Sequence, residues 1–346
     1  MLALRLHPDR RLRLHEEAIP VAADGQALLR VSAVGLCGSD RHWMVEGGIG
    51  DAILSAPLVL GHEFAAIATS GRFAGRRVAV DPADPCGVCE LCLDGRSNLC
   101  QTIRFAGHGQ TDGAMREWMA WSEDCLHPVA DQVSDAEAAL IEPLAVAIHA
   151  IDLGDLREGA TVAVIGCGPI GVLLVGLARR SGASVVIATD PLRHRLELAT
   201  AFGADMTLEP AGPTDAPEAI MAANRGRPCD VVFEVAGEQQ AVDTAVGVAA
   251  PGGRVILVGI PSDDRTSFEA STARRKGLTL KLARRSTPHA FRRAVDLAAS
   301  GQLEIGRLIS ERVALADAPG AIDRFVARTG MKVIIEPGVA RSTGAR

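Results

Sequence analysis

Four cysteines fall within fifteen residues of the chain, in the segment DPCGVCELCLDGRSNLC. Their spacing, C-x2-C-x2-C-x7-C, brings four thiolates to one short loop. Four sulfur ligands are typical of a closed tetrahedral zinc site, which stabilises a loop too short to build a hydrophobic core. We therefore predict a structural zinc ion bound by Cys86, Cys89, Cys92 and Cys100.

Three other interpretations of this cluster fit less well. Eight cysteines in 346 residues are too sparse for a secreted disulfide scaffold. A bacterial-ferredoxin iron–sulfur run ends in x3 and a proline, whereas here the last spacing is x7 and Gln101 follows. A finger that binds nucleic acid is disfavoured because the net charge is -6 and the basic residues are spread along the chain.

A second group of metal-ligand residues stands upstream, in GLCGSD and GHEF. Cys37, His62 and Glu63 supply the thiolate, imidazole and carboxylate that a catalytic zinc uses, with one position left for water or an alcohol oxygen. Each residue alone is unremarkable, since a lone cysteine is usually buried and inert. Glu142, in IEPLAVAIHA, is a further candidate carboxylate, and the sequence leaves open which glutamate ligates the resting zinc.

The segment VAVIGCGPIG carries the pattern G-x-G-x-x-G directly after a predicted strand and at the start of a predicted helix. Gly166 permits the tight turn, Gly168 lets the backbone approach a pyrophosphate, and Gly171 lets the helix pack on the strand. The helix N-terminus adds free N–H groups and the positive end of its dipole. This pattern predicts a dinucleotide-binding site.

An acidic residue, Asp190, closes the next predicted strand. It would accept hydrogen bonds from the adenosine ribose hydroxyls and repel a 2′-phosphate, which favours NAD over NADP. Arg193 and Arg195 follow closely and weaken that preference. The residues that we expect to contact the cofactor are Gly166, Gly168, Pro169, Ile170, Gly171, Asp190, Arg195, Val235 and Gly259.

The elements that must position these groups change character along the chain. Residues 1 to about 140 hold short β-branched runs separated by turn formers, which predicts an irregular β-rich domain. From about residue 160, continuous apolar strands alternate with amphipathic helices, which predicts a parallel sheet covered on both faces. The composition, 48% hydrophobic and 23% charged, is that of a globular protein of roughly two domains.

The sequence offers no sign of export or of a membrane span. Its start, MLALRLHPDRRLRLHEE, has only scattered apolar residues, and the longest apolar runs are short of the ~18 residues that a span requires. We expect a soluble cytoplasmic protein with reduced cysteines.

Taken together, these motifs carry a family resemblance. GLCGSD, GHEF, the four-cysteine lobe, IEPLAVAIHA and VAVIGCGPIG occur in the order found in zinc-dependent medium-chain dehydrogenases, over nearly the whole chain. The helix with the EP pair is most similar to the sorbitol (polyol) dehydrogenase branch. The resemblance implies an α/β fold: a GroES-like β-rich catalytic domain over 1–146, a Rossmann NAD-binding domain over 147–286, and a return segment over 287–346 that completes the catalytic domain.

The resemblance also implies roles for individual residues. Cys37, His62 and Glu63 match the catalytic zinc ligands, and Glu142 matches a carboxylate that ligates directly or through water. Ser39 and His42 match the pair through which the alcohol proton leaves toward solvent, Ser39 first and then His42 by way of a ribose hydroxyl. The implied reaction is the reversible oxidation of a secondary hydroxyl to a ketone with NAD, with zinc as the Lewis acid.

The substrate is less well determined than the reaction. Polyol dehydrogenases of this branch carry an Arg and an aromatic residue where this chain has Leu282 and Ala283, within KLARRSTPHAF, and the chain contains no tyrosine. A polyol, sugar alcohol or cyclitol is favoured, and an L-threonine 3-dehydrogenase type is the alternative. A non-catalytic nucleotide-binding module is the rival from another class, but it would have no use for an open metal position and a proton exit.

We also expect a homodimer or homotetramer. The segment RVILVGIP, residues 254–261, is apolar and rich in β-branched residues, and it looks suited to extending a sheet across a two-fold axis. No nucleic acid and no membrane is expected among the partners.

Overall fold

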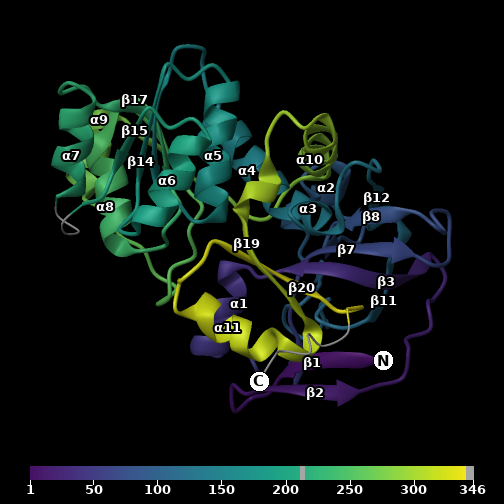
Figure 1. Cartoon of the computed structure of the whole chain (residues 1–346). Coiled ribbons are helices and arrows are strands. Elements are labelled where there is room, and N and C mark those ends of the chain that lie inside the picture. The colour runs from purple at the N-terminus through teal and green to yellow at the C-terminus, as the bar shows by residue number, and fades with distance from the viewer. Residues whose placement is uncertain (211–214, 340–346) are drawn as a thin grey trace. The chain divides into compact units, whose positions relative to one another are not determined.

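The computed structural model describes residues 1–210 and 215–339, and the contacts within it divide the chain into two units (Figure 1). The β-rich unit comprises Met1–Ala145 together with Thr287–Arg346. The parallel-sheet unit comprises Val146–Ser286. Among the described residues, no helix is both long and apolar enough to span a bilayer.

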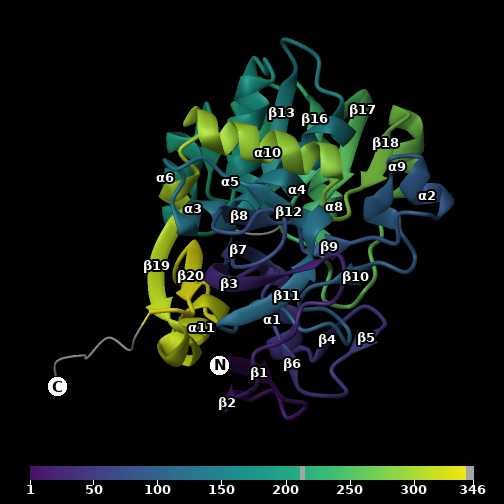
Figure 2. The ribbon, with the colours of Figure 1, turned by 90° about the vertical axis from the view of Figure 1, so that its right-hand side faces the viewer.

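The β-rich unit is built on a seven-stranded sheet in the order β12-β8-β7-β3-β20-β19, with β11 also paired to β3. Figure 2 shows the two C-terminal strands at one edge of this sheet, with β20 next to β3 and β19 outside it. Because β20 pairs antiparallel with β3, the return segment completes a sheet that the N-terminal part begins. The strands are β3 (Gln26–Gly35), β7 (Glu63–Ala68), β8 (Arg77–Val80), β11 (Trp118–Ser122), β12 (Leu126–Pro128), β19 (Ile309–Ala314) and β20 (Lys332–Glu336).

Smaller sheets and helices fill the rest of this unit. Helix α1 starts directly after the Cys37 N-cap, and the cysteine lobe lies between β9 and β10. The short strands are β1 (Leu2–Leu6), β2 (Leu12–Glu16), β4 (Gly48–Ile49), β5 (Ala52–Ile53), β6 (Leu58–Val59), β9 (Ala83–Asp84) and β10 (Arg104–Phe105). The helices are α1 (Gly38–Val45), α2 (Glu90–Leu93), α3 (Asp135–Ala139), α4 (Ile141–Gly154), which continues into the other unit, α10 (Pro288–Ser300) and α11 (Ala318–Val326). Short 3-10 turns are η1 (Ser97–Leu99), η2 (Glu123–Cys125), η3 (Ile305–Leu308) and η4 (Leu315–Asp317).

The core of the β-rich unit forms where alternate strand residues face inward. Along β3 the even-numbered and odd-numbered positions differ in burial until the strand's last residues, which are all buried. The largest side chains of this core are Trp43, Phe64, Met115 and Trp121. The indole N–H of Trp121 donates to the Asp81 carbonyl at 3.0 Å, so its one polar atom is satisfied inside the core.

The parallel-sheet unit has six strands, all parallel, in the order β15-β14-β13-β16-β17-β18. Helices α5 and α6 pack against one another on one face, and α7, α8 and α9 cover the other, as expected for strands buried on both sides. The strands are β13 (Thr161–Ile165), β14 (Val185–Thr189), β15 (Met206–Leu208), β16 (Cys229–Glu234), β17 (Ala249–Leu257) and β18 (Thr279–Leu282). The helices are α5 (Pro169–Arg180), α6 (Arg193–Ala201), α7 (Ala216–Ala223), α8 (Gln239–Val248) and α9 (Ala270–Lys276).

The strand order of this sheet reverses between β13 and β16. The chain first builds outward from β13 to β15 and then returns to place β16 on the other side of β13. Ligands of open parallel sheets bind at the carboxyl ends of the strands, at such a reversal. The two units together confirm the predicted fold class.

Two sequence expectations need correction. The strand within RVILVGIP lies inside the sheet, because β17 pairs with β16 on one side and β18 on the other. The outer strand on that side is β18, so the expectation that 254–261 extends the sheet to a second subunit is wrong. The segment before residue 140 is also less purely β than expected, since it contains α1, α2 and α3.

Two candidate zinc sites and a dinucleotide-binding edge

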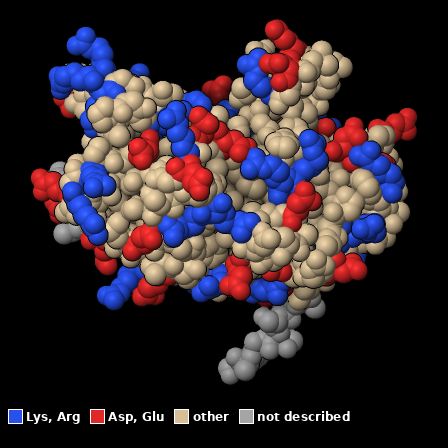
Figure 3. Space-filling view, turned by 90° about the horizontal axis from the view of Figure 1, so that it is seen from above, with Lys and Arg blue, Asp and Glu red and all other residues tan. Residues whose placement is uncertain are grey.

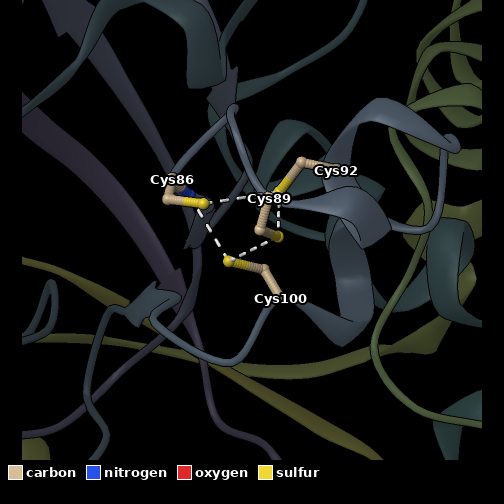
Figure 4. Close-up of side chains that lie close together, drawn as sticks. All are labelled: Cys86, Cys89, Cys92 and Cys100. Carbon is tan, nitrogen blue, oxygen red and sulfur yellow. Dashed lines mark hydrogen bonds between the residues drawn. The ribbon is translucent and has the colours of Figure 1, made fainter.

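The four cysteines of the lobe converge on one point (Figure 4). The Sγ atoms of Cys86 and Cys92 are 3.9 Å apart, those of Cys89 and Cys92 3.4 Å, and those of Cys89 and Cys100 4.0 Å. Zinc–sulfur bonds of about 2.3 Å place tetrahedral ligands ~3.8 Å from one another, whereas a disulfide requires about 2.05 Å. The donor set therefore fits a zinc ion and excludes disulfides among these four residues.

Backbone amides favour the thiolate at Cys86 and Cys100, whereas burial raises the pKa of the Cys92 thiol to about 12. The amides of Val88 and Cys89 donate toward Cys86 and lower the pKa of its thiol to about 6, so the thiolate that zinc requires forms readily. Because all four sulfur atoms face one another, a bound ion would have no position left for a substrate.

The second cluster lies inside the β-rich unit, near the end of β3. Ligand atoms of Cys37, His62 and Glu63 all lie within 4.8 Å of one another. Cys37 caps the start of α1, His62 directly precedes β7, and Glu63 is the first residue of β7. Antiparallel pairing of β3 with β7 sets Gly35 opposite Glu63, which brings two motifs from distant parts of the sequence to one place.

A lysine that the sequence analysis missed holds Glu63. The ammonium of Lys332 donates to both carboxylate oxygens of Glu63, at 2.8 and 2.6 Å, and to the carbonyl of Leu36 at 2.8 Å. A Cβ on Gly35 would lie 2.4 Å from Glu63 Oε2, so only glycine leaves room for this carboxylate. Lys332 is 1% exposed and stands 269 residues from its partner, a separation that no local pattern reveals.

The charges of this buried pair depend on one another. Burial by itself lowers the pKa of Lys332, but the Glu63 carboxylate and the Cys37 thiol raise it overall. The lysine therefore stays an ammonium and compensates the buried carboxylate next to the cluster.

Asp40 lies beside His62 and was also missed. Its side chain is fully buried, with Oδ1 3.6 Å from His62 Nδ1 and Oδ2 accepting from the Cys37 amide at 2.9 Å. The other imidazole nitrogen, Nε2, lies 3.3 Å from the hydroxyl of Ser39. At 3.6 Å the Asp40 carboxylate is too far from Nδ1 for a hydrogen bond, but its charge lies on that side of the ring, opposite the nitrogen that faces Ser39. The GSD triplet contained this signal, because Asp40 is three positions after Cys37.

Glu142 stands at the edge of the cluster. It is 6% exposed, and burial raises its pKa well above the ordinary value, while His62 acts in the opposite direction. Burial also raises the pKa of Cys37 to about 12, with Glu63 adding to the effect. Glu142 interacts electrostatically with the cluster but is not among the three residues whose ligand atoms lie within 4.8 Å. A buried thiol among carboxylates is a donor set that a divalent cation would stabilise.

The two residues expected to carry the proton both lie on α1. Ser39 faces His62, as described above, and His42 Nδ1 lies 2.7 Å from Glu46 Oε2, one helical turn further on. His42 is partly exposed, so its ring can exchange a proton with water.

An aromatic group lines the same region. The ring of Phe105 lies 5.4 Å from that of His62, and His108 lies 6.3 Å from Phe105 and 5.4 Å from Trp43, edge-on in both cases. Phe105 and His108 follow the cysteine lobe in the chain, and the antiparallel pairing of β10 with β9 sets Phe105 opposite Ala83. The sequence analysis did not include these two residues.

The dinucleotide motif lies at the carboxyl edge of the parallel sheet. Gly166 follows β13 with φ +97°, a conformation that side chains rarely adopt, and Gly168 is the N-cap of α5, with Pro169 as its first residue. A Cβ on Gly171 would lie 2.0 Å from the Gly166 carbonyl oxygen. Gly166 and Gly171 thus meet the steric requirements that the motif predicts, while the role of Gly168 toward a pyrophosphate stays a prediction. The amides of Ile170 and its neighbours begin a helix of twelve residues.

Asp190 directly follows β14 at the same edge and is buried. Its carboxylate accepts from the amides of Cys167 at 2.8 Å and Leu192 at 2.9 Å, and Arg195 Nη1 lies 3.7 Å from it. Val235 and Gly259, expected to contact the cofactor, follow β16 and β17 and so share this edge.

Comparison with known proteins identifies the family. The family model for the alcohol dehydrogenase GroES-like domain matches residues 23–131, and that for zinc-binding dehydrogenases matches 169–300. Sorbitol dehydrogenase of Bacillus subtilis is 32% identical over 97% of both chains, and D-xylulose reductase A of Aspergillus oryzae is 32% identical over 96% of both.

Solved structures give the same result. L-idonate 5-dehydrogenase of Escherichia coli superimposes with a TM-score of 0.88 at 28% identity, covering 97% of both chains. A zinc-binding dehydrogenase of Sinorhizobium meliloti bound to NADP also has a TM-score of 0.88, at 33% identity, covering 97% of this chain and 99% of that one. The likeness extends over both units and both motif groups, and the chain belongs to the zinc-dependent medium-chain dehydrogenase family, whose members are oxidoreductases that act on CH–OH groups.

Proposed function

We propose that this enzyme oxidises a secondary hydroxyl of a polyol, sugar alcohol or cyclitol to the ketone, reversibly, with NAD and with zinc held by Cys37, His62 and Glu63. The observation that carries the proposal is the convergence of these three ligand atoms within 4.8 Å, in a chain that also forms a dinucleotide-binding edge. A zinc ion bound there would act as a Lewis acid on the substrate hydroxyl.

The chain's own residues would prepare the reaction in three ways. Lys332 with Gly35 fixes the Glu63 carboxylate before any metal arrives, and Asp40 places a carboxylate 3.6 Å from His62 Nδ1. Ser39, 3.3 Å from His62, is placed to accept the hydroxyl proton. His42, hydrogen-bonded to Glu46, is placed to release a proton to water.

The polyol class is supported by the relatives' names. The similar proteins include a sorbitol dehydrogenase, a D-xylulose reductase, an L-idonate 5-dehydrogenase and a galactitol-1-phosphate dehydrogenase. Basic and acidic side chains are interspersed on the face shown in Figure 3, which gives no support to a nucleic-acid substrate.

A preference for NAD over NADP is supported by Asp190. A 2′-phosphate would meet this buried carboxylate, whereas ribose hydroxyls would donate to it. Arg195 lies close enough to reduce the repulsion, and the relatives include one structure bound to NADP and one complexed with NADH. We therefore expect NAD to be preferred and NADP to be used weakly.

The four-cysteine lobe would hold a second, structural zinc. The sulfur–sulfur distances of 3.4 to 4.0 Å support this assignment, and so does the lack of an open ligand position.

A homodimer or homotetramer remains our expectation, now with β18 as the pairing edge. This outer strand leaves one side of its backbone unpaired in the sheet, and Leu282 at its end is 74% exposed. Sedimentation analysis of the purified protein would give the subunit number.

The test is an initial-rate assay of zinc-loaded enzyme with NAD or NADP against polyols, cyclitols, simple secondary alcohols and L-threonine. Formation of reduced cofactor is followed by its near-ultraviolet absorbance. Rapid turnover of one polyol class, with NAD preferred, would support the proposal. Turnover of L-threonine alone would replace the substrate class, and no turnover despite NAD binding would contradict the polyol assignment.

A further inference from the structure

A buried glutamate outside the zinc cluster stands at the end of β16. Glu234 is 1% exposed, and its Oε1 accepts from the amides of Ala236 and Gly237, each at 2.8 Å. Both donors are backbone N–H groups, so main-chain amides stabilise the carboxylate. Burial raises the pKa of Glu234, while the amides of Gly237, Ala236 and Gly259 act in the opposite direction.

The position of Glu234 in the sheet is central. In register, Glu234 lies between Ile165 at the end of β13 and Leu257 at the end of β17. The loops that follow these three strands therefore begin side by side. The carbonyl of Glu234 accepts from the Val258 and Gly259 amides, at 2.8 and 3.2 Å.

These loops are packed backbone against backbone. A Cβ on Gly259 would lie 2.1 Å from the Gly237 nitrogen, and a Cβ on Gly166 would lie 2.9 Å from the Ala236 nitrogen. The turn over Val235–Gly237 is thus clamped between the loop after β17 and the first glycine of the dinucleotide motif. The Glu234 carboxylate also binds this turn, by accepting hydrogen bonds from the Ala236 and Gly237 amides.

The location indicates which part of a dinucleotide the turn would meet. The pyrophosphate site is at Gly166 and the start of α5, and Asp190 marks the adenosine side, toward β14. β16 and β17 lie on the opposite side of β13 from β14. The half of the cofactor away from the adenosine, which contains the nicotinamide, would therefore cross the turn that Glu234 holds.

We propose that Glu234 is a positioning residue for the nicotinamide half of the cofactor, acting through the backbone of Val235–Gly237 and Gly259. This inference rests on the proposed use of a nicotinamide dinucleotide. Glu234 itself does not take part in the chemistry. Its carboxylate fixes two loops whose main-chain groups and glycines make the binding surface.

The test compares NAD with ADP-ribose, which lacks only the nicotinamide, by calorimetry on the zinc-loaded enzyme. Glu234→Gln keeps the size and shape of the side chain but removes its negative charge. Its NH2 group would replace one carboxylate oxygen at a position surrounded by backbone N–H donors. We expect NAD to bind about tenfold or more weakly, with ADP-ribose affinity changed by less than about twofold. In steady-state kinetics, the KM for NAD should rise more than kcat falls.

Two further variants make the test specific. Asp230→Asn is the matched control, because this carboxylate at the other end of β16 also accepts a backbone amide, that of Thr161 at 2.8 Å. It should leave both affinities unchanged. Gly259→Ala separates the turn and the loop without altering charge, and it should give the same selective loss of NAD affinity even if Glu234→Gln proves unstable.

The outcomes separate this inference from the proposed function. Equal weakening of NAD and ADP-ribose in Glu234→Gln, or no weakening of either, would overturn the role of Glu234. Wild-type enzyme that binds neither NAD nor NADP would instead overturn the proposed cofactor, and the inference with it.

Discussion

The two clusters of candidate metal ligands in the β-rich unit both contain cysteine, but they differ in how far apart their residues lie in the sequence and in how deeply they are buried. In the lobe, all four donors come from residues 86–100, and Cys86 is exposed. In the other cluster, the donors come from Cys37 and from His62–Glu63, and both residues of the second motif are buried. The lobe is therefore local in sequence and has one type of ligand. The other cluster is assembled by strand pairing and has three types of ligand.

The surroundings of the two clusters differ even more. In the lobe, backbone amides donate toward Cys86 and Cys100. Around Cys37 the fold places three buried ionisable side chains of different kinds, those of Asp40, Lys332 and Glu142. A zinc site that keeps one position open for substrate needs neighbouring residues to orient its ligands. In a closed site with four cysteines, the metal itself brings the four thiolates into tetrahedral arrangement.

The largest expected effect is the loss of activity on Cys37→Ser. Removing one of three ligands at the open site should lower kcat/KM by on the order of a thousandfold or more, because the Lewis acid is lost or misplaced. Zinc content, measured by atomic absorption, should fall from two ions per chain to one. Affinity for NAD should stay within a few fold, since the dinucleotide edge belongs to the other unit. Near-full activity in this variant would show that the open site is wrongly assigned.

The next effect is on stability and comes from Cys89→Ser in the lobe. Loss of the closed site should lower the melting temperature by roughly 10 °C, because zinc binding supplies part of the folding free energy there. Enzyme that remains folded should keep most of its kcat. Cys125→Ala, a buried cysteine of the same unit outside both clusters, is the control and should retain full zinc content. A variant with unchanged melting temperature would argue against a structural metal.

Lys332→Met sharpens the comparison, since the lobe has no equivalent of this lysine in the described contacts. It leaves the Glu63 carboxylate buried without its cation, which should cost about 3–5 kcal/mol in the zinc-free protein. Zinc would compensate this buried, unpaired charge, so the gap in melting temperature between zinc-loaded and zinc-free protein should widen. Combining Lys332→Met with Glu63→Gln should restore much of the zinc-free stability. Identical gaps in wild type and variant would refute the coupling.

The smallest expected effect is on the pH dependence of stability, and it comes from His127, which lies outside both clusters. Burial lowers the pKa of His127 to about 4, with Arg292 and Arg72 adding to the shift, from the ordinary 6.5. The unfolded chain then binds the proton more strongly, so stability present above about pH 6.5 is lost as the pH falls toward 4. His127→Phe, which keeps the ring contact with Phe291, should reduce this acid sensitivity in denaturation measured from pH 7 to 4. An unchanged pH slope would count against it.

The sequence by itself determined the features that depend on neighbouring residues. The cysteine spacing, the three glycines after an apolar strand and the alternation of strands with helices are local, and each requires particular residue types at short separations. Fold class and family followed from these patterns. Asp40 was also within reach, since it lies inside the motif of Cys37.

Only the tertiary structure decided the features that depend on pairing between distant segments. Lys332 reaches Glu63 because β20 returns to β3, and Phe105 reaches His62 because the loop after the lobe turns back toward β7. The same holds for β17, whose apolar sequence fits an edge or an interior strand equally, so that pairing with β18 alone settles its place. A sequence pattern records burial and periodicity, whereas the choice of partner is made by packing across the whole unit.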